Sequence, residues 1–346
     1  MFALTTLAEN LEYMLKIGLF GVGHLGKIHL KCILLAQETY ELVGFYDPSD
    51  HNAKKVQEEH DIKRFENAED LMEAVDVVDI VTPTVYHHAI AKQALLKKKH
   101  LFIEKPLTHT IDEAKELIQL ARDNGVKVQV GHVERFNPAL LALGGMELAP
   151  MFVEGHRLAL FNPRGTDVSV VLDLMIHDLD ILLSLVKSEV KNVHATGVSV
   201  VSETPDIANA RLEFENGCVA NLTASRISLK NMRKLRFFQK DAYISLDFLE
   251  KNAQVVRMYE EGDPNSPTEG TFFDLDTPAG KKIIEVSMPP IEQVNAIKME
   301  LESLGISILN ESPVKVPIED GYKALEVAYR IIEEMEKHAD KHLPVL

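Results

Sequence analysis

The sequence predicts two domains: a doubly wound α/β domain with a parallel sheet, followed by an α+β domain with a large, mostly antiparallel open sheet. Strand and helix signals alternate over about the first 130 residues, and β-rich segments follow one another from Glu154 onward. The length of 346 residues also exceeds what one hydrophobic core usually serves. We expect an N-terminal extension at 1–14, a first domain at 15–135 and a second at 136–346, whose last helix could pack back on the first.

The first domain is predicted from apolar runs separated by segments with helical periodicity. The expected strands are Leu15–Phe20, Leu42–Tyr46, a short one near Ile62–Phe65, Val77–Val81, His100–Ile103 and Val126–Val130. The expected helices are Lys27–Gln37, Ala53–His60, Ala68–Ala74, His87–Leu96 and Ile111–Asn124, the last ended by Gly125. This alternation is typical of a parallel sheet with helices on both faces.

The second domain is predicted from longer β-rich segments. The expected strands are Glu154–Phe161, Val190–Val201, Ala208–Glu215, Val219–Ile227 and Lys234–Phe248, with a hairpin turn at Asn216-Gly217. An apolar helix over Val171–Leu185 interrupts the series, and an amphipathic helix over Gly321–Lys337 lies near the end. Runs of strands with few helices favour an antiparallel sheet.

Composition and charge exclude several classes of function. The net charge of −16 argues against nucleic acid and anionic membranes as partners, and no apolar run reaches the ~18 residues of a membrane span. The first residues carry Glu9 and Glu12 but no Lys or Arg before Lys16, which is the wrong charge for a secretory leader. Cys32 and Cys218 have no metal or redox spacing, so we expect reduced thiols in a cytoplasmic protein.

A glycine-rich turn follows the first predicted strand. Gly21-Val22-Gly23-His24-Leu25-Gly26 stands between that strand and the first helix. In a dinucleotide-binding Rossmann domain, such glycines make a tight turn, let the pyrophosphate approach the backbone and let helix and strand pack closely. The helix N-terminus then holds the phosphates. A turn without a ligand is the alternative, but the surrounding strand and helix favour a dinucleotide site.

Asp47 ends the second predicted strand, about 20 residues beyond the glycine motif. A carboxylate there accepts hydrogen bonds from the ribose hydroxyls and repels a 2′-phosphate. No Arg follows closely, although Lys54 and Lys55 are near. We therefore expect NAD as cofactor, with NADP as the alternative.

Two later strands also end in residues suited to a ligand. Thr82-Pro83 follows the strand Val77–Val81, and Glu104-Lys105-Pro106 follows the strand His100–Ile103. Ligands bind at the carboxyl ends of such strands, so Lys105 is expected near the nicotinamide, where it could stabilise charge on a substrate oxygen. A surface salt bridge with Glu104 is the alternative. His87 is expected to cap a helix or contact the nicotinamide side, and no histidine spacing indicates a metal.

The apolar helix Val171–Leu185 carries a polar stripe. Asp173, His177, Asp180 and Ser184 are spaced for one helix face, and a buried polar stripe needs partners or a wet cleft. His177 titrates near neutrality and suits proton transfer with a substrate hydroxyl, with Asp173 one turn earlier to orient it. A core His bonded to a core Asp, without catalytic duty, is the alternative.

Together these motifs resemble the Gfo/Idh/MocA oxidoreductases, from about Leu15 to the final helix. The resemblance is carried by Gly21 to Gly26, Thr82-Pro83, Glu104-Lys105-Pro106 and Asp173-x-x-x-His177 in that order. It implies that Lys105 is the catalytic lysine, His177 the acid/base and Asp173 its companion, with His87 near the cofactor. It also implies oxidation or reduction of a secondary alcohol on a sugar or inositol, and a homodimer or homotetramer formed through the C-terminal sheet.

A narrower resemblance concerns Gly131 to Pro138 and Val171 to Asp180. These segments look like the UDP-N-acetylglucosamine 3-dehydrogenase branch, which implies a nucleotide sugar substrate and a 3-keto product. Arg135, Arg157 and Arg164 are then candidates for holding the diphosphate, because Arg recognises phosphate oxygens in paired geometry. Structural ion pairs are the alternative for each of the three.

Two other functions share the expected fold. An NAD-dependent glycoside hydrolase would use its cofactor transiently and release no net NADH. A sensor without enzymatic activity would bind a dinucleotide but would have no need of Lys105, Asp173 and His177. A dehydrogenase acting on a CH–OH group is the preferred interpretation.

Overall fold

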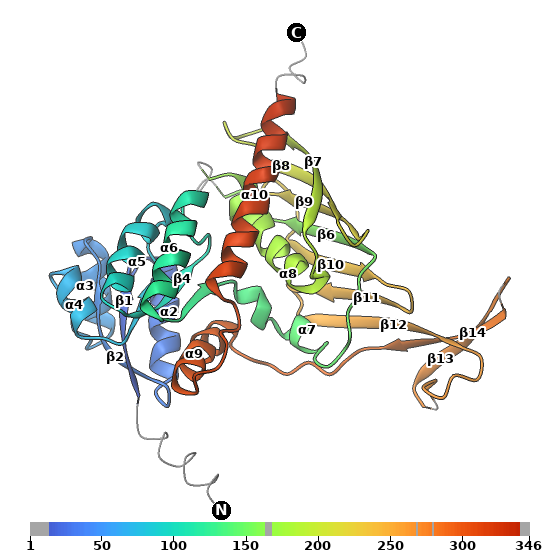
Figure 1. The fold of residues 1–346 in the computed structure, drawn as a ribbon, viewed down its shortest axis with the longest axis horizontal. Coiled ribbons are helices and arrows are strands. Elements are labelled where there is room, and N and C mark those ends of the chain that lie inside the picture. The colour runs from blue at the N-terminus through green and yellow to red at the C-terminus, as the bar shows by residue number, and fades with distance from the viewer. Residues whose placement is uncertain (1–13, 163–167, 268, 279, 340–346) are drawn as a thin grey trace, which may run out of the picture. The chain divides into compact units, whose positions relative to one another are not determined.

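The computed structural model describes residues 14–162, 168–267, 269–278 and 280–339, and the chain forms two compact units (Figure 1). Unit 1 comprises Met1–Val133 and Asn295–Tyr322, and unit 2 comprises Glu134–Val294 and Lys323–Leu346. The first break lies close to the expected boundary at 135. The start of the last helix, at 318–322, returns to unit 1, whereas the return of residues 295–317 was not expected. The predicted extension at 1–14 lies, apart from Met14, outside the described residues.

A five-stranded parallel sheet forms the centre of unit 1, with strand order β2-β1-β3-β4-β5. The strands are β1 (Leu15–Phe20), β2 (Tyr40–Tyr46), β3 (Val77–Ile80), β4 (His100–Glu104) and β5 (Val128–Gly131). Every neighbouring pair in it is parallel, which confirms the predicted fold class of this unit. Parallel pairing also places the carboxyl ends of all five strands at one edge of the sheet.

The predicted sixth strand near Ile62–Phe65 is wrong. This segment makes one isolated bridge, between Arg64 and Phe45. Phe45 donates to the Lys63 carbonyl at 3.0 Å and accepts from the Phe65 amide at 2.9 Å. The close approach of this segment to β2 depends on Gly44, where an added Cβ would lie 2.5 Å from the Lys63 carbonyl oxygen. The segment is therefore held beside β2 without extending the sheet.

Six helices in the described part of unit 1 accompany this sheet. They are α2 (His24–Leu35), α3 (Asp50–Glu59), α4 (Ala68–Glu73), α5 (His87–Leu96), α6 (Ile111–Asn124) and α9 (Ala296–Leu309). The bounds of α5 and α6 are those predicted, and α6 has both a capping box between Thr110 and Glu113 and a left-handed cap at Gly125. α9 was not predicted from the sequence.

α9 completes the core of unit 1 although it is distant in sequence. Leu301 and Leu304 of α9 are fully buried in one apolar cluster with Ile17 of β1, Ile33 of α2 and Phe102 of β4. Tyr40 of β2 donates its hydroxyl to the Leu301 carbonyl at 2.7 Å, which ties the helix to the sheet edge. The core of the parallel sheet therefore depends on residues near the end of the chain.

Unit 2 contains a nine-stranded sheet of order β13-β14-β12-β11-β10-β6-β9-β8-β7. Its strands are β6 (Phe152–Leu158), β7 (Val190–Val198), β8 (Ile207–Phe214), β9 (Val219–Ser225), β10 (Met232–Phe238), β11 (Ala242–Asp247), β12 (Asn252–Glu260), β13 (Thr271–Thr277) and β14 (Gly280–Ser287). Only β6 and β9 pair in parallel among them, so the predicted, mostly antiparallel sheet is confirmed. The predicted hairpin turn is present, with Gly217 at φ +85°.

Two strand predictions for unit 2 need correction. The segment Lys234–Phe248 is not one strand, because the Gln239 amide bonds to the Ala242 carbonyl and turns the chain between β10 and β11. The strands β12 to β14 were not predicted, because few of their residues are buried and β13 is almost wholly exposed, so they show little of the apolar pattern that marks a buried strand.

Helices cover one face of this sheet. They are α7 (Pro138–Leu141), α8 (Ile176–Val186) and the part of α10 (Ile318–Ala339) that belongs to unit 2. Val327, Ala328 and Ile331 of α10 share a buried cluster with α8 and with alternate residues of the strands. Among the residues described, no helix has both the length and the apolar composition that crossing a membrane requires.

Candidate active site

The glycine-rich turn has the geometry that a dinucleotide requires. Gly21 has φ +91° and donates its N–H to the Tyr46 carbonyl at 2.9 Å, which ties the turn to β2. A Cβ on Gly26 would lie 2.0 Å from the Gly21 carbonyl oxygen, so only glycine allows helix and turn to meet there.

Gly23 has the opposite surroundings. A Cβ built on this N-cap residue of α2 would meet nothing within 4 Å, and no side chain caps the helix N-terminus. His24 and Leu25, which follow it, are exposed. Open backbone at an uncapped helix N-terminus is what a pyrophosphate needs for close approach. These residues fit an NAD molecule, whose nicotinamide would supply the hydride acceptor.

Asp47 holds the turn from the end of β2. Its Oδ2 accepts the Val22 N–H and its Oδ1 accepts the Ser49 N–H, both at 2.8 Å. Each carboxylate oxygen keeps a further lone pair that can accept a ribose hydroxyl. The structure also brings Arg64 close: it donates to the Asp47 carbonyl at 3.1 Å and pairs with Asp50 at 2.8 Å. Arg64 is 17 residues beyond Asp47, so it could not be recognised as a neighbour from its position in the sequence.

His87 joins two loops of the site. Its Nε2 lies 2.8 Å from the Thr82 carbonyl oxygen and its Nδ1 lies 3.0 Å from the Pro106 carbonyl oxygen. Burial lowers the pKa of His87, so the imidazole is neutral at neutral pH and donates to one carbonyl at a time. The structure therefore gives His87 a part in fastening the loop after β3, with Thr82 and Pro83, to the loop after β4.

Lys105 follows β4 directly, at the same edge of the sheet as the glycine-rich turn and Thr82. Its backbone N–H donates to Oε2 of Glu104 at 3.1 Å, and the peptide bond to Pro106 is cis. The Glu104 carboxylate thus bonds to the lysine's backbone, and its other oxygen faces His29 at 3.1 Å. Glu104 holds the loop from inside the unit, and the Lys105 side chain is half-buried.

In unit 2, a π-helical segment precedes the helix with His177. The segment is Val171–Met175, where the Ile176 N–H bonds to the Val171 carbonyl, five residues earlier. Asp173 and His177 are both half-buried. The predicted single stripe is only partly right. Ser184 donates to the Ile181 carbonyl, and both carboxylate oxygens of Asp180 accept from Arg135. Asp178, outside the predicted stripe, is also buried and bonded.

Two arginines proposed for a diphosphate are engaged in ion pairs within unit 2. Arg135 donates to both carboxylate oxygens of Asp180, at 2.6 and 2.8 Å. Arg157 is 3% exposed; its Nη2 is 2.7 Å from Asp178 and its Nη1 is 2.9 Å from Glu134. Burial alone would lower the pKa of Arg157, but the two carboxylates outweigh it and raise the pKa, so the guanidinium stays charged.

These ion pairs favour the structural alternative for Arg135 and Arg157. Val153 and Arg157 both lie on the buried face of β6. The sequence already contained this signal, because alternate residues of a strand point to the same face. Arg164 lies outside the described residues.

Comparison with known proteins identifies the fold and its cofactor. A family model described as an oxidoreductase family with an NAD-binding Rossmann fold matches residues 15–132, and one for the GFO/IDH/MocA C-terminal domain matches residues 155–244. UDP-N-acetylglucosamine 3-dehydrogenase of Acidithiobacillus ferrooxidans is 38% identical over 254 residues, which are 73% of this chain and 79% of that protein. The chain belongs to the Gfo/Idh/MocA family. It is an NAD-binding oxidoreductase of the dehydrogenase kind.

Solved Gfo/Idh/MocA-like structures agree with this fold over nearly the whole chain. That of UDP-N-acetylglucosamine 3-dehydrogenase GnnA from Acidithiobacillus ferrooxidans has a TM-score of 0.83 at 32% identity and covers 94% of this chain and 99% of that one. Levoglucosan dehydrogenase, in complex with NADH and levoglucosan, has a TM-score of 0.80 at 18% identity over 94% of this chain and 98% of that one, which shows the fold alone. In sequence, scyllo-inositol 2-dehydrogenase (NAD(+)) of Bacillus subtilis is 28% identical over 63% of this chain and 69% of that protein.

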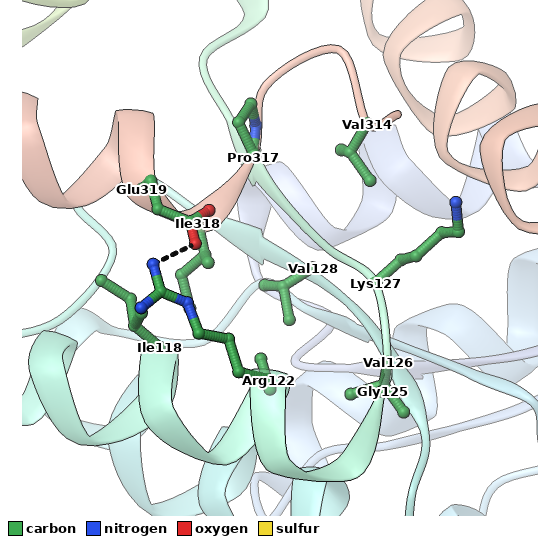
Figure 2. Close-up of a pocket in the computed structure, with 11 residues that line it drawn as sticks. Ile118, Arg122, Gly125, Val126, Lys127, Val128, Val314, Pro317, Ile318 and Glu319 are labelled. Atoms are coloured by element: carbon green, nitrogen blue, oxygen red, sulfur yellow. Dashed lines mark hydrogen bonds and ion pairs between the residues drawn. The ribbon is translucent and has the colours of Figure 1, made fainter. Parts of the chain in front are cut away.

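This Gfo/Idh/MocA chain also has a pocket away from the glycine-rich turn. It has a volume of about 280 Å³ and is lined by the end of α6, the start of β5 and residues 314–319 (Figure 2). Arg122 and Glu319 form an ion pair at its wall, 3.0 Å apart. Because it adjoins the amino end of β5, it lies at the edge of the sheet opposite Lys105, and we assign it no part in the reaction.

Proposed function

We propose that the protein oxidises a secondary alcohol of a nucleotide sugar with NAD, and that the alcohol is the C3 hydroxyl of UDP-N-acetylglucosamine. The observation that carries this proposal is Lys105 at the carboxyl edge of a sheet whose glycine-rich turn fits NAD, in a chain 38% identical to a UDP-N-acetylglucosamine 3-dehydrogenase. Asp173 and His177 on the second unit supply the acid/base pair that such an oxidation needs.

The proposed reaction assigns one task to each side chain. His177 takes the proton from the substrate hydroxyl, while the Lys105 ammonium stabilises the negative charge that grows on the same oxygen. The hydride leaves the carbon that carries this hydroxyl, and NAD, when bound, accepts it. Asp173 orients the His177 imidazole. The proposal requires that the Lys105 and His177 side chains reach the same hydroxyl.

The diphosphate is assigned to Arg164 in this proposal. Arg135 and Arg157 are bonded to carboxylates that an anionic substrate would have to displace, and breaking such buried pairs is costly. Replacing Arg164 by Ala should therefore raise the KM for the nucleotide sugar and leave the affinity for NAD unchanged. An unchanged KM would remove this residue from the site.

The direct test is NADH formation by the purified protein with NAD and UDP-N-acetylglucosamine, followed at the nicotinamide absorbance. His177→Ala should lower kcat by about 10² to 10⁴ with little change in NAD affinity, and Lys105→Met should also lower kcat. Cleavage of a glycoside without net NADH would instead identify an NAD-dependent hydrolase. NAD binding without turnover of any sugar, nucleotide sugar or inositol would favour a sensor.

We further propose that the protein acts in the cytoplasm as a homodimer or homotetramer formed through the sheet of unit 2. Two free, buried cysteines, Cys32 and Cys218, support a reducing compartment. Alternate residues of the strands are left partly exposed on the sheet face away from the helices, which supports a role in association. Light scattering over a range of concentrations tests the oligomeric state, and a monomer throughout would reject it.

A further inference from the structure

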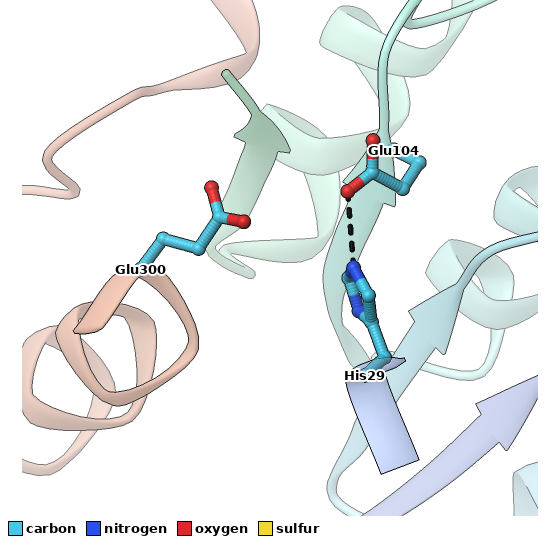
Figure 3. A group of neighbouring side chains, drawn as sticks. All are labelled: His29, Glu104 and Glu300. Carbon is cyan, nitrogen blue, oxygen red and sulfur yellow. Dashed lines mark hydrogen bonds and ion pairs between the residues drawn. The ribbon is translucent and has the colours of Figure 1, made fainter. Parts of the chain in front are cut away.

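Four ionisable side chains meet in the interior of unit 1. His29 of α2 lies between Asp79 of β3, whose Oδ2 is 3.0 Å from Nδ1, and Glu104 of β4, whose Oε1 is 3.1 Å from Nε2. Glu300 of α9 completes the group, and Figure 3 shows its carboxyl group directed toward Glu104 and His29. His29, Asp79 and Glu300 are fully buried and Glu104 is nearly so.

With Asp79 and Glu104 ionised, the two contacts of His29 require the protonated ring. An ionised carboxylate only accepts hydrogen bonds, and a neutral imidazole carries a single N–H, so both contacts are satisfied at once only by the imidazolium. Burial alone would lower the pKa of His29, but the carboxylates of Asp79 and Glu104 outweigh burial and raise it well above its ordinary value. The other titratable groups near this cluster are the Cys32 thiol, the Tyr40 hydroxyl and Glu300.

Glu300 differs from the other two carboxyl groups. Neither of its oxygens has a hydrogen-bond partner among the described residues, and its side chain is fully buried. Ionising such a group is very costly, and burial together with the neighbouring Glu104 carboxylate raises the pKa of Glu300 well above its ordinary value. Glu300 is therefore a neutral carboxylic acid, and His29 balances Asp79 and Glu104 alone.

The cluster is connected to the loop of Lys105 through Glu104. One oxygen of the Glu104 carboxylate accepts from His29, and the other accepts the Lys105 backbone N–H at 3.1 Å. Gly131 of β5 closes a third side, since an added Cβ there would lie 2.7 Å from Oε1. The carboxylate therefore has a fixed position, and it fixes the backbone from which the lysine side chain starts.

We propose that His29 is a positioning residue for Lys105. The His29 imidazolium, held by Asp79, fixes the Glu104 carboxylate, and this carboxylate accepts the Lys105 backbone N–H. The proposal rests on the proposed catalytic role of Lys105. The competing occupant is a divalent cation, because one ligand atom each from His29, Glu104 and Glu300 lies within 4.8 Å of the others. Such a cation would replace the protons on His29 and Glu300, so the two states are chemically distinct.

The first test needs neither substrate nor activity. In the apo protein, the ¹⁵N resonances of the His29 ring should show both nitrogens protonated at neutral pH, and the Lys105 amide should be protected from hydrogen exchange. As pH rises, protection of that amide should be lost in the same step in which His29 deprotonates. A neutral His29 at neutral pH, protection that does not follow its titration, or a stoichiometric divalent metal by elemental analysis would each overturn the proposal.

The second test uses variants with a matched control. Asp79→Asn keeps the shape but removes a charge that His29 needs, and His29→Gln removes the imidazolium. Each should raise the exchange rate of the Lys105 amide at least about tenfold and lower kcat by about 10- to 100-fold, with the KM for NAD unchanged. In Asp79→Asn the alkaline limb of the kcat profile should also move to lower pH.

The control is Glu300→Gln, which preserves the neutral form and should leave exchange, kcat and the pH profile as in the wild type. An unchanged exchange rate of the Lys105 amide in both Asp79→Asn and His29→Gln would show that His29 does not position Lys105. Altered exchange in a protein that oxidises no substrate would support the positioning of the loop and reject the proposed function instead, so the two failures are distinguishable.

Discussion

Gly23 and Gly26 are one helical turn apart, yet the structure places opposite demands on them. A Cβ at Gly26 meets the Gly21 carbonyl oxygen, whereas a Cβ at Gly23 meets open space. Gly26 is therefore required by the fold of the protein alone. Gly23 is required only when a pyrophosphate approaches the backbone.

Gly23→Ala should preserve the fold and weaken NAD binding by about tenfold or more, because the methyl group occupies the space that the pyrophosphate needs. Gly26→Ala should instead destabilise the protein itself by about 1–3 kcal/mol or more through overpacking. Thermal unfolding without cofactor and calorimetric titration with NAD separate the two effects. Equal NAD affinities of Gly23→Ala and wild type would contradict the assigned phosphate position.

Glu300→Gln should make the protein more stable at alkaline pH. The carboxyl group has an ordinary pKa of 4.5 in the unfolded chain and a higher one in the folded protein, so unfolding releases a proton between these values and stability falls as pH rises. The variant has no such proton. Its advantage over wild type should grow by up to about 1.4 kcal/mol per pH unit in that range. Parallel stability curves from urea unfolding at about pH 6 and pH 8 would show that Glu300 is ionised in the folded protein.

At this scale the sequence predicted local motifs well and long-range partners poorly. Gly21 to Gly26 and Asp47 are within one strand-helix-strand unit, so their spacing in the sequence was enough to predict that they lie close together. His29, Asp79, Glu104 and Glu300 come from four elements spread over most of the chain, and no spacing rule connects them. A partial signal existed, because Gly26, His29 and Ile33 fall on one buried face of α2.

Among the elements, α9 shows how a helix far along the chain can belong to an early domain. Its buried residues are not strongly segregated by hydrophobicity, and Glu300 stands among them, so amphipathic periodicity was weak. β12 to β14 were missed for a similar reason. Strands and helices that are buried on one well-defined face, such as α6 and β8, were predicted with nearly correct bounds.

Leu304→Ala in α9 should destabilise unit 1 by about 2–5 kcal/mol, because the fully buried side chain fills the cluster with β1 and α2. Ile306→Ala on the same helix, where the side chain is 51% exposed, should change stability by no more than about 0.5 kcal/mol. Chemical denaturation of both variants provides the measurement. Equal losses would mean that α9 does not pack as described.

The helix carrying His177 is anchored by its buried ion pairs. Asp178→Ala would leave Arg157 in the interior with Glu134 as its remaining carboxylate partner, and we expect a loss of about 3–5 kcal/mol. Glu213→Gln removes one partner of an exposed pair, 3.5 Å from Arg211, and should have little effect. Urea unfolding tests both. A small loss for Asp178→Ala would show that water or another group compensates Arg157.

Over the whole molecule, the chain passes between the two units three times, after Val133, Val294 and Tyr322. Residues 14–133 contain the complete parallel sheet, yet their core lacks Leu301 and Leu304 when α9 is absent. We therefore predict that this segment alone does not fold stably. Joining residues 295–322 to it through a flexible linker should restore cooperative unfolding and NAD binding, as judged by circular dichroism and calorimetry. A stable, NAD-binding fragment 14–133 would contradict this.

The discontinuous make-up of unit 1 has a consequence for recombination between relatives. A hybrid enzyme that takes everything after Val133 from another parent would combine a nucleotide-binding half with a foreign α9, and the side chains around Ile17 and Ile33 would no longer match. Crossover points after Val133 and after Val294 avoid this, because α9 then stays with its own parallel sheet and the exchanged insert carries Asp173 and His177, which we propose to act on the substrate. Chimaeras designed to alter sugar specificity should follow these two junctions, with α10 adjusted on the face that it presents to the new insert.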